Sequence, residues 1–149
     1  MNLAGETHGS FVLIFILLIV FCGCGLKSTR GGLPAAVESV IGTVTDDIAQ
    51  ERYEKVYNEA ALLWKQDATG EQSTEVLKTL HAKLGTVQNR AVHSATEQEN
   101  SGGPLRGHVF IVTYQTKFER GEAMETFTLI EEDGRWKLAR YLVNSTALK

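Results

Sequence analysis

The sequence predicts an α+β domain in which N-terminal helices pack on one face of an antiparallel sheet of about four strands. Between residues 36 and 84, apolar side chains recur at the spacing of amphipathic helices, whereas from Thr86 onwards they alternate with a period of two. The pairs Arg120-Gly121 and Asp133-Gly134 then separate the last three strands as tight turns. Helices followed by a run of hairpin strands are typical of α+β domains in which the helices cover one sheet face.

Three helical segments are expected, over residues 36–48, 53–64 and 73–84. The stretch Asp67–Gln72 breaks the helical pattern, and Gly85 is placed to end the third helix. The residues expected to face inward from that helix are Val76, Leu77, Leu80 and Leu84. Asp46 and Asp47 are interpreted as part of the solvated face of the first helix rather than as a paired-carboxylate site.

Four strands are expected, over residues 87–96, 108–118, 122–131 and 135–143, with a mobile polar loop at residues 97–106. Treating both turns as two-residue loops pairs Tyr114 with Phe127, Thr116 with Glu125, Leu129 with Leu138, and Phe127 with Arg140. The predicted core face contains Phe110, Val112, Tyr114, Phe118, Phe127, Leu129, Trp136, Leu138 and Leu142. The opposite face is mostly polar and is expected to meet solvent.

The residues before this domain predict export. The run from Phe11 to Cys22 is uninterrupted apolar sequence, which as a helix is too short for a bilayer core of about 30 Å but matches the hydrophobic region of an export signal. We therefore expect a signal peptide at residues 1–23, a flexible tether at residues 24–34 and a single α+β domain at residues 35–149. The predicted location is the cell envelope, with the domain in the periplasm or at the cell surface.

The end of the apolar run predicts lipidation at Cys24. The sequence Phe21-Cys22-Gly23-Cys24 resembles the bacterial lipobox, in which a small residue precedes a cysteine that is lipidated and becomes the new N-terminus. An acyl chain such as palmitate on Cys24 would then hold the protein at the membrane. An uncleaved anchor and an ordinary cleaved signal stay open as alternatives, because residues 1–10 contain no Lys or Arg. Lys27 and Arg30 follow the run instead, which by the positive-inside rule favours a cytoplasmic domain.

The composition argues against several classes of function. A net charge of −3 and dispersed Lys and Arg residues provide no basic surface for phosphates, so no nucleic-acid partner is expected. Both cysteines precede the domain, so we expect no disulfide within it. The four histidines do not have metal-ligand spacing, and neither a nucleophile elbow nor a phosphate-binding loop is present. The sequence therefore predicts no metal and no cofactor.

Two stretches, Leu84–Arg90 (LGTVQNR) and Val112–Ser145, resemble a bacterial family of envelope proteins known as domain of unknown function 4019. This family is grouped with the nuclear transport factor 2-like, or cystatin-like, folds. Its marks here are the LG-x-V-x-x-R segment, the YQT-x-F strand, Glu125, and the DGRW hairpin leading to Tyr141. The resemblance implies a curved sheet wrapped around helices and no established activity. Family members tend to have a glycine before the last-strand tyrosine, where this chain has Ala139-Arg140.

Three polar side chains fall on the apolar face in the expected register, Tyr114, Glu125 and Arg140, with Thr116 beside them. An acid, a phenol and a guanidinium in an apolar cleft could transfer a proton or bind a small polar ligand, with Glu125 as the base. The alternative interpretation is structural: Glu125 and Arg140 form an ion pair near the end of the sheet, and Tyr114 caps the core.

These observations lead to three functional hypotheses. The leading one is a non-enzymatic envelope lipoprotein whose domain binds a protein partner or a small ligand. The competing one is a small pocket enzyme of the isomerase or dehydratase kind, with Glu125 as base and Tyr114 as polarising donor. The third is a tethered domain that forms a homodimer through its exposed sheet face. A cavity beside Glu125 would favour the enzyme, whereas a sealed ion pair would remove its support.

Overall fold

The computed structural model describes residues 27–28 and 32–149; the predicted signal peptide and Cys24 lie outside these residues. The four helices are α1 (Ala35–Ala49), α2 (Tyr53–Glu59), α3 (Leu62–Asp67) and α4 (Gly70–Leu84). The long strands are β2 (Val87–Asn100), β3 (Gly107–Phe118), β4 (Gly121–Glu132) and β5 (Arg135–Asn144), and a short 3-10 helix, η1 (Thr146–Leu148), follows. Two residues of the predicted tether form an additional short strand, β1 (Lys27–Ser28).

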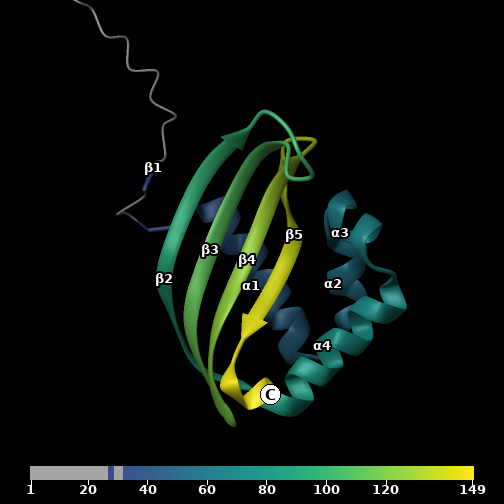
Figure 1. Ribbon diagram of the computed structural model, residues 1–149, viewed down its shortest axis with the longest axis vertical. Helices are drawn as coiled ribbons and strands as arrows, with labels where there is room; N and C mark the ends of the chain where they lie inside the picture. The colour runs from purple at the N-terminus through teal and green to yellow at the C-terminus, as the bar shows by residue number, and fades with distance from the viewer. Residues whose placement is uncertain (1–26, 29–31) are drawn as a thin grey trace, which may run out of the picture.

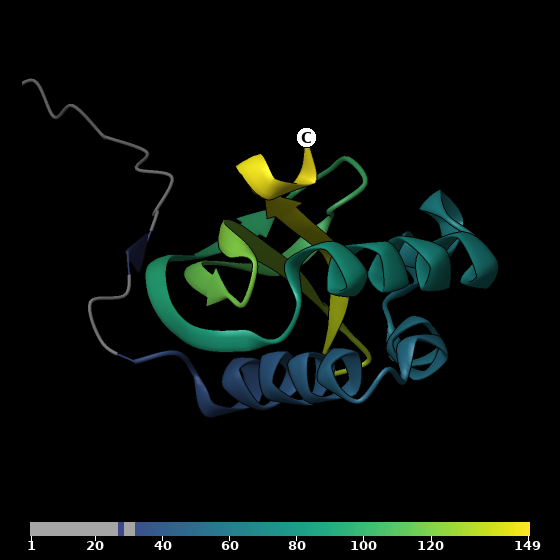
Figure 2. The same ribbon diagram turned by 90° about the horizontal axis from the view of Figure 1, so that it is seen from below.

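All five strands belong to one antiparallel sheet with the order β1-β2-β3-β4-β5. The sheet is curved, α1 runs behind it, and α2 to α4 lie beside β5 (Figure 1). Turning the molecule shows that the helices gather on one side of the sheet (Figure 2). The predicted fold class, with N-terminal helices packed on a curved antiparallel sheet, is therefore confirmed.

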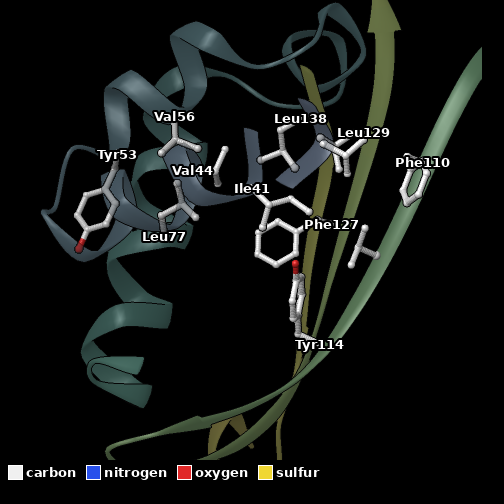
Figure 3. Close-up of a cluster of buried hydrophobic side chains, with 12 residues drawn as sticks. Ile41, Val44, Tyr53, Val56, Leu77, Phe110, Tyr114, Phe127, Leu129 and Leu138 are labelled. Atoms are coloured by element: carbon white, nitrogen blue, oxygen red, sulfur yellow. The ribbon is translucent and has the colours of Figure 1, made fainter. Parts of the chain in front are cut away.

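The main core lies between the helices and the concave face of the sheet (Figure 3). Its fully buried side chains include Val37 of α1, Leu77 of α4, and Phe110, Phe127 and Leu129 of the sheet. Burying an aliphatic or aromatic side chain of this size stabilises a fold by about 1.5–3 kcal/mol. The predicted alternation of inward-facing and outward-facing side chains along β3 and β4 is correct. The helices pack on the inward-facing apolar side chains.

The second predicted helical segment is divided by two extended alanines. Ala60 and Ala61 separate α2 from α3, and the amide of Ala61 donates a hydrogen bond of 2.9 Å to the carbonyl of Leu138 in β5. The chain thus uses Ala61 to pair with the otherwise free edge of the sheet, and such edges are commonly covered in natural proteins. The apolar periodicity continues across this break, which explains why the sequence predicted one continuous helix.

Helix α4 begins three residues earlier than predicted. Thr69 and Gln72 form a capping box. The amide of Gln72 donates to the hydroxyl of Thr69 at 3.2 Å, and the amide of Thr69 donates to the side-chain oxygen of Gln72 at 2.9 Å. The predicted break therefore contains the start signal of the helix. Gly85 ends the helix as expected, with a φ of 77°. Of the residues predicted to face inward, Leu77 and Leu84 are buried, whereas Val76 is exposed.

The first tight turn lies one residue earlier than predicted, at Glu119 and Arg120, because Phe118 pairs with Gly121. Two backbone hydrogen bonds attach this turn to the end of α4, from Glu119 to Thr86 at 3.0 Å and from Arg120 to Leu84 at 2.9 Å. These long-range contacts set the register. Tyr114 consequently pairs with Glu125 rather than Phe127, but a shift of two partners leaves every side chain on its predicted face.

The second turn is correct, and the strand after it contains a bulge. Asp133 and Gly134 both have positive φ, as a type I′ hairpin requires, and Leu129 pairs with Leu138 as predicted. The register then shifts, so that Thr128 pairs with Arg140 and the intervening Ala139 has no partner. From this point the faces are reversed, and the predictions for Arg140 and Leu142 are wrong. Leu142, for example, is 62% exposed.

The segment before α1 and the first long strand also extend the sheet. Strand β2 continues to Asn100, so the predicted loop at residues 97–106 is shorter than expected. Residues Lys27 and Ser28 pair with Glu97 and Thr96, and Leu33 packs against the main core. Within the described residues, no helix combines the length and the apolar character needed to cross a membrane.

Candidate functional site

Glu125 lies at the centre of a polar network on the concave face. Its side chain is 1% exposed, and Arg90 donates two hydrogen bonds to it, from Nε at 2.8 Å and from Nη2 at 3.1 Å. The hydroxyl of Tyr141 donates to Oε1 at 2.5 Å, and the buried hydroxyl of Thr116 donates to Oε2. Four hydrogen bonds from three side chains therefore converge on one buried carboxylate.

Each of the four long strands contributes one residue to this network. Arg90 comes from β2, Thr116 from β3, Glu125 from β4 and Tyr141 from β5. The alternation of each strand places these side chains on the concave face, and the bulge at Ala139 brings Tyr141 to that face. The network thus connects four strands across the interior of the curve.

Aromatic rings hold the guanidinium of Arg90 in place. Its central carbon lies 5.6 Å from the ring centre of Tyr114 and 5.8 Å from that of Phe127, within the range of cation–π contacts. Tyr114 meets Phe127 edge to face, and Figure 3 shows its hydroxyl directed toward the side of the core that contains Ile41. Tyr114 therefore contacts Arg90 through its ring, whereas its hydroxyl makes no hydrogen bond within the described residues.

The geometry leaves Glu125 little capacity for proton transfer. A carboxylate accepts about four hydrogen bonds, and all four positions are used. A cavity of about 40 Å³ lies beside Glu125, Arg90 and Tyr141. One water occupies about 30 Å³, whereas small-molecule sites usually measure about 300–1,000 Å³. The cavity has room for a water molecule and not for a substrate.

The two tyrosines around the network both keep their protons at neutral pH. Burial raises the pKa of Tyr141 well above its ordinary value, and the negative charge and hydrogen bond of Glu125 raise it further. Burial also raises the pKa of Tyr114, while the nearby charge of Arg90 acts in the opposite direction. Tyr141 is accordingly a permanent hydrogen-bond donor to Glu125 at neutral pH.

The structure brings together only part of the predicted site. Glu125, Thr116 and Tyr114 lie close together on the concave face, but Arg140 does not, because the bulge turns it to the other side. Arg140 instead lies 3.6 Å from Asp67 at the protein surface. The guanidinium of the network belongs to Arg90, and Tyr141 supplies the phenol that bonds to Glu125. The predicted ion pair of Glu125 is real, but its partner was wrong.

The two residues that the sequence analysis missed, Arg90 and Tyr141, were present among the marks of the family resemblance, as was Thr116, which it had placed beside the site. Arg90 ends the LG-x-V-x-x-R segment, Thr116 belongs to the YQT-x-F strand, and Tyr141 follows the DGRW hairpin. All three contact Glu125, itself one of the marks. The residues that carry the resemblance therefore form one buried network, and their joint occurrence was the signal for it.

A second buried carboxylate, Asp47, lies in the last turn of α1. Asp47 is 1% exposed; Lys55 binds it at 2.9 Å, and Arg52 binds it through two nitrogens. Burial alone would raise the pKa of Asp47, but the hydrogen bonds and charges of Lys55 and Arg52 outweigh burial and lower it. The interpretation of Asp47 as solvated was wrong. It lies three residues after Val44 on the inward stripe of the helix, and that spacing was the available signal.

Asp47 borders a cleft of about 450 Å³ between α1, α2 and the start of β5. Its floor includes Val44, Val56 and Leu138, all buried, so the cleft reaches the main core. A larger hollow of about 540 Å³ between α2 and α4 has no buried side chain in its wall. The cleft beside β5, rather than that hollow, has the mixture of apolar floor and polar rim typical of ligand sites.

Another titratable cluster lies at the far end of the sheet. His108 contacts Glu97 at 2.6 Å and Glu131 at 2.9 Å, and its ring lies 4.7 Å from that of Trp136. The hydrogen bond to Glu131 raises the pKa of His108, against the effect of partial burial, and Glu97 adds to the increase. Among residues 27–28 and 32–149, no group of three or more metal-binding side chains is arranged to hold an ion.

The sequence and the fold were compared with known proteins and solved structures. The profile of a family described as "Protein of unknown function (DUF4019)" matches residues 42–141. No curated protein matches the sequence. Among solved structures, the chain is similar to a putative scytalone dehydratase from Novosphingobium aromaticivorans, with 12% identity over 74% of this chain and 82% of that chain. The TM-score of that comparison is 0.40, and a similarity this low carries no information about activity.

Proposed function

Since the chain belongs to the DUF4019 family of proteins of unknown function, we propose that it is a membrane-tethered, non-enzymatic binding module of the bacterial cell envelope. The observation that carries the non-enzymatic part is the state of Glu125. Its carboxylate is the only candidate base on the concave face that the sequence singled out, and four hydrogen bonds already occupy it. A general base needs a free lone pair within reach of its substrate.

The sizes of the cavity beside Glu125 and of the cleft beside β5 support binding over catalysis. The cavity beside Glu125 measures about 40 Å³, and the cleft beside β5 about 450 Å³. The residues proposed for catalysis, Glu125 and Tyr114, do not line the larger cleft. The space that could hold a ligand is therefore separate from the groups that could have performed proton transfer.

The position of the tether is compatible with binding by an anchored domain. Lys27 and Ser28 pair with β2, three residues after Cys24, whereas the cleft lies beside β5. β1 and β5 are the two outer strands of the sheet. An anchor that precedes β1 therefore lies at one edge of the sheet, and the cleft lies at the opposite edge. A lipid on Cys24 would then hold the domain at the membrane without covering the cleft.

Metabolic labelling with a fatty acid tests the anchor. We expect the wild type and Cys22→Ala to incorporate the label and Cys24→Ala to lose it, because only Cys24 follows the small residue of the lipobox. Cys22→Ala is a matched control, since it removes the same side chain two residues away. Equal labelling of the wild type and Cys24→Ala, or no labelling of any form, would overturn the lipid anchor.

A further inference from the structure

The floor of the cleft beside β5 is formed by apolar side chains from three elements. Helix α1 contributes Val40 and Val44, α2 contributes Val56, and β5 contributes Trp136 and Leu138. A volume of about 450 Å³ falls within the 300–1,000 Å³ usual for sites that bind small molecules. An apolar group inserted here would exclude water from side chains that belong to the main core.

Both carboxylates that line the cleft are already neutralised. Asp47 is bound by Arg52 and Lys55, and Glu59 lies 3.6 Å from the ammonium of Lys55. Lys137 is also paired, because its ammonium lies 3.1 Å from Glu132. An incoming ligand therefore meets no free negative charge on this wall.

Two cationic side chains that line the cleft, Lys65 and Arg135, remain available to bind an anion. Within the described part of the chain, no carboxylate lies within 4 Å of the charged groups of Lys65 or Arg135. The ammonium of Lys65 donates to the carbonyl of Asn58 at 2.7 Å, which uses one of its three protons and holds it near the cleft. Arg135 begins β5 directly after the Asp133-Gly134 turn, and its guanidinium suits planar carboxylates.

We propose that this cleft binds a small carboxylic acid with an apolar body, which lies on the apolar floor while its carboxylate meets Lys65 and Arg135. The inference rests on the proposed binding function and names its ligand class. A neutral apolar molecule would make no ionic contact with either cation, and a cationic one would approach them against electrostatic repulsion. The charge left unpaired on the rim thus selects an anion, and the floor selects its apolar part.

The test uses three water-soluble probes that share one apolar body: 3-phenylpropionate, 3-phenylpropanol and 3-phenylpropylamine. The full chain is prepared in lipid nanodiscs with 5-fluorotryptophan in place of its two tryptophans. Trp136 lines the cleft, whereas Trp64 donates a hydrogen bond of 2.9 Å to Ser73 and is not part of its wall. The ¹⁹F signal of Trp136 reports binding, and that of Trp64 is the internal reference.

We expect 3-phenylpropionate to shift the Trp136 signal and to bind at least tenfold more tightly than the alcohol or the amine. Lys65→Gln combined with Arg135→Gln should weaken binding of the acid about tenfold and leave binding of the alcohol unchanged. Lys78→Gln combined with Arg106→Gln removes the same charge from exposed positions outside the cleft and should have no effect.

Tighter binding of the alcohol or the amine would overturn the choice of an anion while leaving a ligand-binding cleft. An unchanged affinity of the acid in the Lys65 and Arg135 variant would do the same. No shift of the Trp136 signal with any probe would overturn the cleft as a ligand site. None of these results bears on fatty-acid labelling at Cys24, so failure of this inference is distinguishable from failure of the anchor.

Discussion

Glu125 and Asp47 are both carboxylates with 1% exposure, yet their counter-ions differ in access to water. Arg90, which pairs with Glu125, is 19% exposed, and two hydroxyls complete that network. Arg52 and Lys55, which pair with Asp47, are 42% and 43% exposed, and no hydroxyl contributes among the described residues. One carboxylate is enclosed by the sheet, and the other is the inner end of a surface cluster.

This difference separates a structural role from a binding role. A buried ion pair leaves a costly uncompensated charge when one partner is removed, whereas exposed cations regain water. Glu125 therefore connects the four strands, and its carboxylate has no free acceptor position for proton transfer. Asp47 lies in the wall of the open cleft, where its cations cancel its charge and leave Lys65 and Arg135 to meet a ligand.

The largest effect is expected from Glu125→Gln. The change leaves Arg90 inside the sheet without its counter-ion and should lower the free energy of unfolding by about 3 kcal/mol, the lower end of the range for broken buried pairs. Asp47→Asn should cost about 1 kcal/mol, because Arg52 and Lys55 return to solvent. Urea unfolding followed by tryptophan fluorescence measures both. Equal losses would contradict the idea that exposure of the counter-ion decides the cost.

These two carboxylates also show which features of the fold and the site could be predicted from the sequence. The fold class, the two faces of β3 and β4 and the importance of Glu125 followed from periodicity and turn residues, because these are local signals. The partner of Glu125 did not follow. It depends on the bulge at Ala139 and on the pairing of β2 with β3, and both join residues that are far apart in the sequence.

A local hint of the bulge is the glycine that family members tend to have before the last-strand tyrosine, where this chain has Ala139-Arg140. A glycine inside a strand often marks a bulge. Ala139, which is also small, is buried in one cluster with Ala61 and Leu63. Asp47 was missed for a different reason. A carboxylate in a helix usually faces solvent, but the helical spacing of Asp47 places it on the buried stripe of α1, where Arg52 and Lys55 compensate its charge.

A second, smaller effect is expected from acid. The folded-state pKa of Asp47 lies below its ordinary value of 3.8, so its ion pairs stabilise the fold above pH 3.8, and this stability is lost as the pH falls through the folded-state pKa. The difference in unfolding free energy between the wild type and Asp47→Asn should therefore be constant near neutral pH and shrink below pH 3.8. Asp46→Asn, at the exposed neighbouring position, should show almost no difference at any pH. A gap that widens in acid would mean that Asp47 is not ion-paired in solution.

The smallest effect is expected from Arg140→Ala, and it separates the predicted site from the observed one. Arg140 lies 3.6 Å from Asp67, and these side chains are 42% and 54% exposed. Exposed pairs of this kind contribute at most about 0.5–1 kcal/mol, so the loss of stability should be close to the error of urea unfolding. Arg90→Ala is the matched control, because it removes the same side chain from Glu125 and leaves that carboxylate buried without its cation. If Arg140→Ala cost as much as Arg90→Ala, the bulge at Ala139 would be misplaced, since only an unbulged β5 would point Arg140 toward Glu125.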